Sequence, residues 1–320
     1  ILADEHVLLC TVTCDNTGAT PRTVRVFATN IYGYVAQRWW GSDGFCTNMN
    51  QRGDALVSKI WAYGDVCVVH AGAPAEALYA HTAPAAWSAA LRTGAGRTAR
   101  QVHCAASEAV YATRQHALTL AGGATQTLTL CLARGVNEDA AQAAGAAALA
   151  NAAAHRAARR ADDQAFYAQM PLLAGDWPAA WKEGWLHDFE TLRMTVRPPC
   201  GIFSGRWDGM QIFSPRCVLG ETALDMVTLS FADAACAKEV LRTTMCDTPG
   251  PHVPCCREDG SMNMIGTDGS ECGTSPVWGL PFKVIMSLYQ RAPDDEWLRA
   301  IYPRMVAFVE WWCEHRTDAK

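Results

Sequence analysis

The sequence predicts a multidomain protein of the β plus α class, in which a β-sandwich is followed by the first hairpins of a barrel of paired helices. Up to about residue 134 the chain alternates short β-like runs with turn residues, and beyond Pro171 its apolar residues recur at helical spacing. An Ala-rich stretch without proline lies between these two patterns. We therefore expect a sandwich domain (1–136), a helical linker (137–170) and the N-terminal part of a helical domain (171–320).

The N-terminal part contains strand-like runs separated by turn residues. Residues 6–14 and 23–32 are such runs. A hairpin is predicted between 55–61 and 66–71, and another between 118–120 and 126–132, where Ala-Gly-Gly-Ala separates the two runs. No helix is expected among these runs, and closely spaced strands of this kind predict a sandwich.

The Ala-rich segment at 137–169 predicts a helical linker. It opens on Asn137-Glu138-Asp139, a cluster of the residue types that cap helix N-termini. Alanine, arginine and glutamine follow, and all three have high helix propensity.

The C-terminal part predicts pairs of helices joined by long polar loops. Residues 218–230 and 234–244 form one expected pair, and 277–290 and 296–315 form the next. The loop between the pairs, 246–276, is dense in glycine, proline and acidic residues, and loops of that length in compact domains are usually functional. Because so few helices cannot close a barrel, we expect the domain to continue beyond Lys320.

Composition excludes several classes of function. The net charge of −5 supplies no basic footprint for nucleic acid, and no apolar run is long enough to span a membrane. The 14 cysteines contain no CxxC pair, and Cys67, Cys104 and Cys131 lie in apolar runs. Cysteines in such runs are expected to be buried, reduced thiols, which favours a cytoplasmic protein.

No cofactor or metal ion is expected. The nine histidines form neither an H-x-H nor an HExxH spacing, so a metal site is not predicted. The chain also lacks the GxGxxG, P-loop and GxSxG motifs of dinucleotide-binding proteins, nucleotide-binding proteins and serine hydrolases.

Acidic and aromatic residues cluster in the helical half in a way that suits carbohydrate. Sugars present apolar CH faces that stack on aromatic rings, and hydroxyl groups that need fixed polar partners. Hydrolysis of a glycosidic bond further requires one protonated and one ionised carboxyl group. The candidate substrate-binding residues are Arg206, Trp207, Asp208, Glu221, Arg257, Glu258, Asp259, Glu271 and Trp278.

Structural interpretations compete with these functional ones. Asp225 and Asp233 fit a helix surface or a helix cap, and Asp259-Gly and Asp268-Gly are ordinary turn dipeptides. Five tryptophans at helical spacing fit a core: Trp181, Trp185, Trp297, Trp311 and Trp312. For the loops 205–211 and 257–278 to form a site, they must converge at one end of the helical half, with Trp207 or Trp278 exposed in an open cleft.

From about Trp185 onward, the chain resembles glycoside hydrolase family 63 and the mannosylglycerate-hydrolase-like proteins. Residues 219–241 resemble that family's Trp-Asp-Ser-Phe-Phe…Ala-Lys-Glu segment, and 274–278 resembles its Ser-Gln-Pro-Pro-x-Trp stretch. Trp311-Trp312 resembles the helix end that follows. Trehalases and other six-hairpin glycosidases share weaker versions of these motifs.

The resemblance implies an inverting α-glycosidase with an (α/α)6 barrel, acting on an α-linked glucosyl or mannosyl glycoside. The sugar-binding carboxylate of the family matches Asp208 by residue type and Glu221 by its distance from the downstream motif. The family's general acid lies in a Glu-Ser-Gly-x-Asp motif that this chain does not contain. The resemblance therefore places the catalytic acid and base beyond Lys320, and the chain alone is expected to be inactive.

Two other classes remain open. A glycoside phosphorylase pairs a similar sandwich and barrel, and would need a phosphate pocket to which Arg257 could contribute. A non-catalytic helical scaffold is the third class, although no repeat of 30 to 45 residues is visible.

Overall fold

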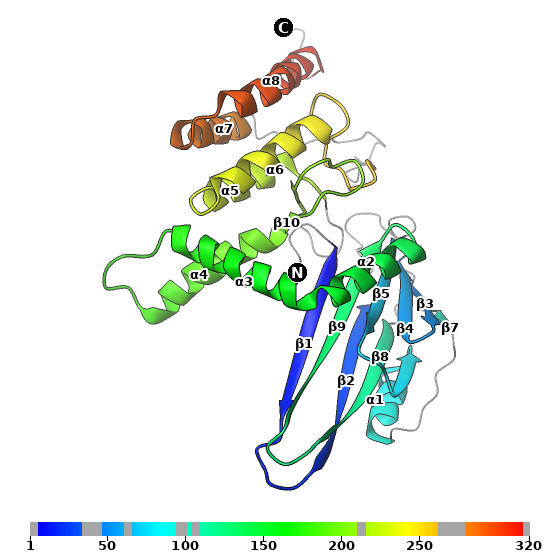
Figure 1. The fold of residues 1–320 in the computed structure, drawn as a ribbon. Coiled ribbons are helices and arrows are strands. Elements are labelled where there is room, and N and C mark those ends of the chain that lie inside the picture. Colours follow the sequence, from blue (N-terminus) through cyan, green and yellow to red (C-terminus); the bar gives the residue numbers. More distant parts are fainter. Residues whose placement is uncertain are drawn as a thin grey trace. The chain divides into compact units, whose positions relative to one another are not determined.

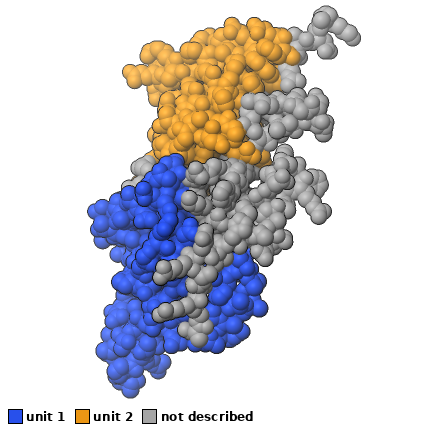
Figure 2. Space-filling view, turned by 90° about the vertical axis from the view of Figure 1, so that its right-hand side faces the viewer, with its two compact units in different colours: residues 1–159 blue, residues 160–320 orange. Residues whose placement is uncertain are grey.

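The computed structural model divides into two compact units, Ile1–Arg159 (unit 1) and Arg160–Lys320 (unit 2), which Figure 2 colours separately. Strands dominate unit 1 and helices dominate unit 2, which confirms the expected β plus α multidomain class. The division falls inside α3 (Ala152–Gln169), within the segment predicted as a linker. The structure describes residues 6–33, 47–60, 66–93, 101–103, 109–209, 216–261 and 279–315.

Unit 1 contains two antiparallel sheets (Figure 1). The larger, six-stranded sheet has the order β1 (Val7–Asp15), β9 (Thr125–Gly135), β5 (Val66–Gly72), β4 (Ala55–Ile60), β3 (Thr47–Arg52) and β7 (Gln101–His103). The smaller, three-stranded sheet has the order β2 (Arg22–Gly33), β8 (Ala109–Leu120) and β6 (Ala77–His81). The predicted hairpin at 55–61 and 66–71 is confirmed, because β4 pairs with β5.

Alternating side chains of the larger sheet fill two different cores. Leu56 of β4 packs with Ala80, Val110 and Ala112 of the smaller sheet. Its neighbour Val57 points to the opposite face, which α2 (Glu138–Ala150) covers. This helix begins where the sequence predicts, because the Asn137 side chain accepts a hydrogen bond from the Ala140 amide at 2.8 Å.

The second predicted hairpin is wrong. β8 and β9 belong to different sheets, so the Ala-Gly-Gly-Ala turn between them crosses from one sheet to the other. Asn16 is buried beside this turn, and its Nδ2 donates to the carbonyls of Thr20, Leu120 and Ala121. Gly123 has a φ of 72° and donates its amide to the Asn16 carbonyl at 2.9 Å. A contact more than 100 residues away in sequence thus fixes the crossing.

A helix also lies where none was expected. α1 (Pro84–Thr93) follows β6, and its Trp87 stacks on Tyr111 of β8 with ring centroids 5.0 Å apart. The Trp87 Nε1 donates to Thr113 Oγ1 at 2.9 Å. Trp87 thereby fixes α1 on the smaller sheet.

Unit 2 contains the predicted helices in successive layers (Figure 1). These are α4 (Ala179–Thr195), α5 (Leu219–Leu229), α6 (Ala234–Asp247), α7 (Leu280–Arg291) and α8 (Asp295–His315). α5 packs against α6 and α7, and α6 also packs against α8. Asp233 caps α6 and Asp294 caps α8, accepting from the amides of Cys236 at 2.9 Å and Trp297 at 3.0 Å.

Two further expectations from the sequence concern membrane-spanning helices and the state of the cysteines. Among the described residues, no helix combines the length and apolar character that crossing a membrane requires. Cys67 and Cys131 are buried as expected, and Cys131 is a reduced thiol. Cys104 lies outside the described residues.

Candidate carboxylate site

Two connections of unit 2 meet beside the N-terminus of α5. The Ile202 amide donates to the Glu258 carbonyl at 2.8 Å, and Cys217 and Cys256 exchange backbone hydrogen bonds of 2.9 and 3.3 Å. Trp207 lies in the same buried cluster as Cys256. Segments that border the two predicted loops thus contact each other. Residues 210–215 and 262–278 lie outside the description, so the convergence of the loops themselves stays a prediction.

A short antiparallel pair of strands holds Asp208 near the first turn of α5. β11 (Trp207–Asp208) pairs with β10 (Val196–Arg197), which directly follows α4, so that Asp208 lies opposite Val196. Thr222 of α5 donates its hydroxyl to Asp208 Oδ2 at 3.0 Å. Asp208 is fully buried, and its Oδ1 has no hydrogen-bond partner within the described part of the chain.

Burial sets the electrostatic character of Asp208. Removal from water raises the pKa of this carboxyl, because the ionised form loses its hydration. The hydroxyl groups of Thr195 and Thr222 and the positive charge of Arg197 oppose that rise without cancelling it. Glu221 adds a negative charge that raises the pKa further. Burial, and not the balance of neighbouring charges, therefore dominates the pKa shift of Asp208.

Glu221 and Asp225 place two further carboxyl groups on one face of α5. They are four positions apart, so their side chains lie on the same side of the helix. The Glu221 Oε2 is buried and finds no hydrogen-bond partner among the residues described. Burial raises the pKa of Asp225 to about 7, with further contributions from the charges of Asp208 and Glu221. Asp208, Glu221 and Asp225, which we call the carboxylate trio, form one electrostatic group.

Arg197 is the cation that acts on this group from β10. Its Nε donates to the Gly209 carbonyl at 3.1 Å, and its guanidinium lies 6.0 Å from the Trp207 ring centroid. A Cβ atom at residue 209 would overlap the Arg197 side chain. The glycine at this position therefore lets the Arg197 side chain lie directly against the backbone. Arg197 balances part of the negative charge of the carboxylate trio.

Sequence reasoning missed Asp225 and Arg197. Asp225 was expected on a helix surface or cap, but it is partly buried beside two other carboxyl groups. The spacing of Glu221 and Asp225 in one helix was the available signal. Arg197 gives no comparable signal, because only the β10–β11 pairing brings it near Asp208.

Trp207 is not the exposed ring of the predicted pair Trp207 or Trp278. Its side chain is completely buried and stacks on Phe203 with ring centroids 4.5 Å apart and an interplanar angle of 17°. Its Nε1 donates to the Pro198 carbonyl at 3.1 Å. Trp207 therefore fixes the loop that carries Asp208, and offers no exposed face to a sugar ring. Glu271 and Trp278 lie outside the described residues.

The other candidate residues belong to different local structures. Arg206 forms an ion pair with Glu239 of α6 at 3.9 Å. Arg257 donates to Ser261 Oγ at 3.2 Å, and Asp259 accepts from the Ser261 amide and hydroxyl at 2.9 and 2.6 Å. Glu258 accepts from the Cys200 thiol at 3.5 Å. The contacts at 257–261 are those of a tight turn, as the structural interpretation of Asp259-Gly held.

The protonation of Asp225 has a measurable consequence for stability. Because its folded pKa of about 7 exceeds the ordinary value near 3.9, unit 2 loses stability as the pH rises from about 4 through 7. Replacing Asp225 by Asn is therefore expected to stabilise unit 2 at pH 8 by roughly 2 kcal/mol and to flatten this pH dependence. Urea unfolding followed at pH 5 and pH 8 measures both effects. Equal stability of the variant and the parent chain at pH 8 would contradict the assignment.

The comparisons with known proteins identify no family for this chain. A scan against models of protein families found no match, and a search of curated proteins found no matching protein. Fold and site thus define a β plus α protein with a buried carboxylate site in its helical unit.

Proposed function

We propose that this chain belongs to a glycoside hydrolase, and that the carboxylate trio binds the sugar next to the bond that is cleaved. The observation that carries the proposal is the pair of buried acceptors, Asp208 Oδ1 and Glu221 Oε2, for which the described residues supply no donor. A buried acceptor without a donor is costly. A ligand that presents several hydroxyl donors removes this cost at both atoms, and sugars are such ligands.

The arrangement of the trio favours hydroxyl groups over a metal ion. Within the described ranges, no three His, Cys, Asp or Glu side chains are placed to hold an ion together. Asp225 also retains its proton up to about pH 7, which makes it a poor ligand for a cation and a good hydrogen-bond donor.

Glycoside hydrolysis needs one carboxyl group that donates a proton to the leaving oxygen and another that remains ionised. In the family that the chain resembles, the acid belongs to a Glu-Ser-Gly-x-Asp motif that this sequence does not contain. The carboxylate trio is therefore proposed to bind the sugar and not to transfer the proton. In the inverting form that the family resemblance implies, the acid and base lie about 6.5–9.5 Å apart to admit a water molecule.

The helical layers support the barrel that belongs to this proposal. α5 packs on α7 and α6 packs on α8, so each helix of one pair meets its counterpart in the next. An (α/α)6 barrel continues this arrangement until it closes. The loop ends that converge beside α5 would then line the mouth of the barrel.

The phosphorylase alternative receives less support. A phosphate pocket needs cationic donors directed at the ligand, and Arg257 instead donates to Ser261 within its own turn. The hydrolase is therefore the better proposal. The buried thiols of Cys131, Cys217 and Cys256 further support a reducing compartment such as the cytoplasm.

The test is a titration of the chain with methyl α-D-glucoside and methyl α-D-mannoside, followed by saturation-transfer NMR at pH 6. We expect one of the two glycosides to bind. Replacing Glu221 by Gln is expected to weaken its binding at least about tenfold, since hydrogen bonds to a charged acceptor contribute 1.5–3 kcal/mol. The matched control is Glu310→Gln on the exposed surface of α8, which should leave the affinity unchanged.

Two outcomes would overturn the proposal. The first is a parent chain that binds neither glycoside. The second is stabilisation of unit 2 by CaCl2 or MgCl2 that Glu221→Gln abolishes, since this would identify a cation site in place of a sugar site.

A further inference from the structure

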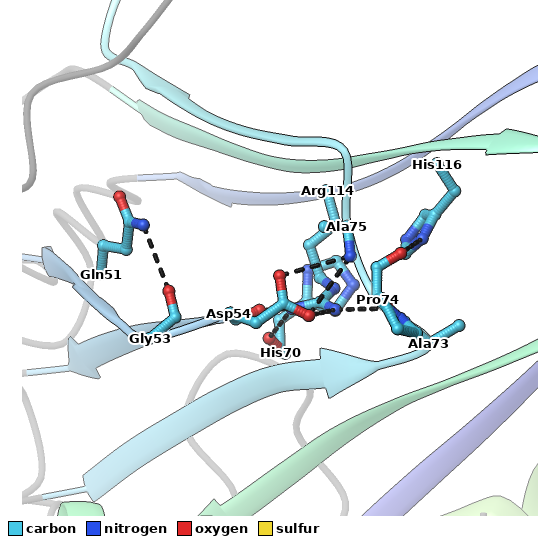
Figure 3. Close-up of polar contacts among 9 residues, drawn as sticks. All are labelled: Gln51, Gly53, Asp54, His70, Ala73, Pro74, Ala75, Arg114 and His116. Atoms are coloured by element: carbon cyan, nitrogen blue, oxygen red, sulfur yellow. Dashed lines mark hydrogen bonds and ion pairs between the residues drawn. The ribbon is translucent and has the colours of Figure 1, made fainter.

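Arg114 in unit 1 joins three separate segments of the chain (Figure 3). The residue lies on β8 and is completely buried. Its Nη2 donates to the Ala73 carbonyl at 2.7 Å and to Asp54 Oδ2 at 3.1 Å, and its Nη1 donates to the carbonyl of Asp54. Asp54 in turn accepts from the Ala75 amide at 3.2 Å. We call this set of contacts, made by Asp54, Ala73, Ala75 and Arg114, the Arg114 tie.

The Arg114 tie links the two sheets of unit 1. Asp54 lies in the turn between β3 and β4, and Ala73 and Ala75 lie in the connection from β5 to β6. Arg114 reaches both from the smaller sheet, and its Nη1 lies 3.4 Å from the His70 carbonyl on β5. Loss of the tie would therefore release the turn, the connection and the contact between the sheets together.

Two buried histidines flank Arg114. His70 on β5 and His116 on β8 are 4 % and 2 % exposed. The Nδ1 of His116 lies 2.8 Å from the Pro74 carbonyl, which requires the proton on that nitrogen. His116 Nε2, His70 Nδ1 and Arg114 Nε are buried and have no hydrogen-bond partner in the described part of the chain. Neither ring can therefore take a second proton without burying an unpaired donor next to a guanidinium.

The groups around the two rings are mostly positive or neutral. Arg114 and His116 act on His70, whereas Arg114 and Asp54 act on His116. Cys131 of β9 also interacts with Arg114 as a neutral thiol. Glu76 bonds to Gln115 at 2.7 Å, and Gln115 points to the opposite face of β8. Asp54 is thus the carboxylate that acts on the cluster, and its side chain is half exposed.

We propose that His70, Arg114 and His116 form an acid-sensitive latch, in which protonation of the histidines breaks the Arg114 tie and opens unit 1. A histidinium beside Arg114 competes for the Asp54 carboxylate and repels the guanidinium. Opening exposes both positive charges to water and so removes their repulsion. The latch would act in mildly acidic solution, where histidine is the side chain that ordinarily changes charge.

The pKa values give the direction of this response. Burial lowers the pKa of His70 to about 3, and the charges of Arg114 and His116 lower it further. Burial also lowers the pKa of His116, although its bond to Pro74 opposes the change. An unfolded histidine titrates near 6.5, so the open chain binds more protons than the closed one below that pH. Stability of unit 1 is therefore full above about pH 6.5 and is lost as the pH falls toward 3.

The test is hydrogen–deuterium exchange of the full chain between pH 7.5 and pH 5, corrected for intrinsic exchange rates. Below about pH 6.5, protection of β5 and β8 amides is expected to fall about tenfold per pH unit for each histidine that resists protonation. This window lies above the range in which ordinary carboxyl groups titrate. The variant His70→Leu/His116→Asn should flatten the response, and His187→Gln on the exposed surface of α4 should retain it.

Three results would overturn the latch. One is protection of β5 and β8 that does not change between pH 7.5 and 5, and another is a double variant with the slope of the parent chain. If the double variant does not fold, NMR titration of the parent chain decides: a ring of His70 or His116 that titrates near 6.5 in the folded state excludes the latch.

Discussion

Replacing Arg114 by Met is expected to lower the free energy of unfolding of unit 1 by about 3–5 kcal/mol, without a change in unit 2. Methionine has a similar length and is apolar, so most of the packing is retained. The loss comes from the polar groups that Arg114 leaves behind: the carbonyls of Ala73 and Asp54 and the Asp54 carboxylate. Exposure of half of the Asp54 side chain allows partial rehydration, which places the effect toward the lower end of the range.

Urea unfolding with exchange readouts on β8 and on α5 reports the two units separately. The control is Arg52→Met, since the Arg52 side chain is 57 % exposed and forms a surface ion pair with Glu138 at 2.7 Å. Such exposed pairs contribute little, so the control should behave like the parent chain. An equally small effect of Arg114→Met would mean that water replaces the lost donors and that no tie exists.

The two units are expected to respond to pH in opposite directions. His70 has a lowered pKa, so acid destabilises unit 1, whereas Asp225 has a raised pKa, so base destabilises unit 2. Both shifts have the same main cause, since burial favours the neutral form of either group. Buried titratable groups of opposite charge type thus separate the pH optima of two units within one chain.

The elements predicted correctly from sequence depend on local patterns. The start of α2 follows from Asn137, and the starts of α6 and α8 follow from the aspartates that precede them, because a cap acts within one turn of its helix. The pairing of β8 and β9 could not be predicted in this way. A Gly-Gly turn suits a hairpin and a crossing between sheets equally well, and the choice depends on Asn16, far away in the sequence.

The sequence indicated which residue types form the candidate site, but it did not indicate which of their side chains are buried. Asp208 and Glu221 were predicted because acidic and aromatic residues cluster in the helical half, and because the sugar-binding carboxylate of the family that the chain resembles matches one or the other. The roles of Asp225 and Arg197 arise from their surroundings, which depend on the hydrogen bond from Thr222 of α5 to Asp208 of β11 and on the pairing of β10 with β11. An aromatic residue next to an acid suggested a sugar platform at Trp207, but the sequence carries no information on which way the ring faces.

Replacing Trp207 by Ala is accordingly expected to act on folding. The ring is fully buried between Phe203 and the residues around Cys256, so its removal leaves a large cavity and should cost unit 2 about 3–5 kcal/mol. Trp207→Phe retains the stack and loses the bond to Pro198, which should cost about 1–2 kcal/mol. Trp181→Ala is the control, because that ring is 60 % exposed and its removal should change stability little.

Stability and sugar affinity, measured on the same variants, separate the two roles of Trp207. If the ring supports the loop that carries Asp208, then Trp207→Phe should bind a glycoside as tightly as the parent chain, because the carboxylate trio keeps its positions. If the ring instead stacks on the sugar, Trp207→Ala should lose affinity while its stability remains unchanged. The complete burial of Trp207 and its bond to Pro198 favour the first result, since a residue that holds Asp208 in place affects binding only through the fold.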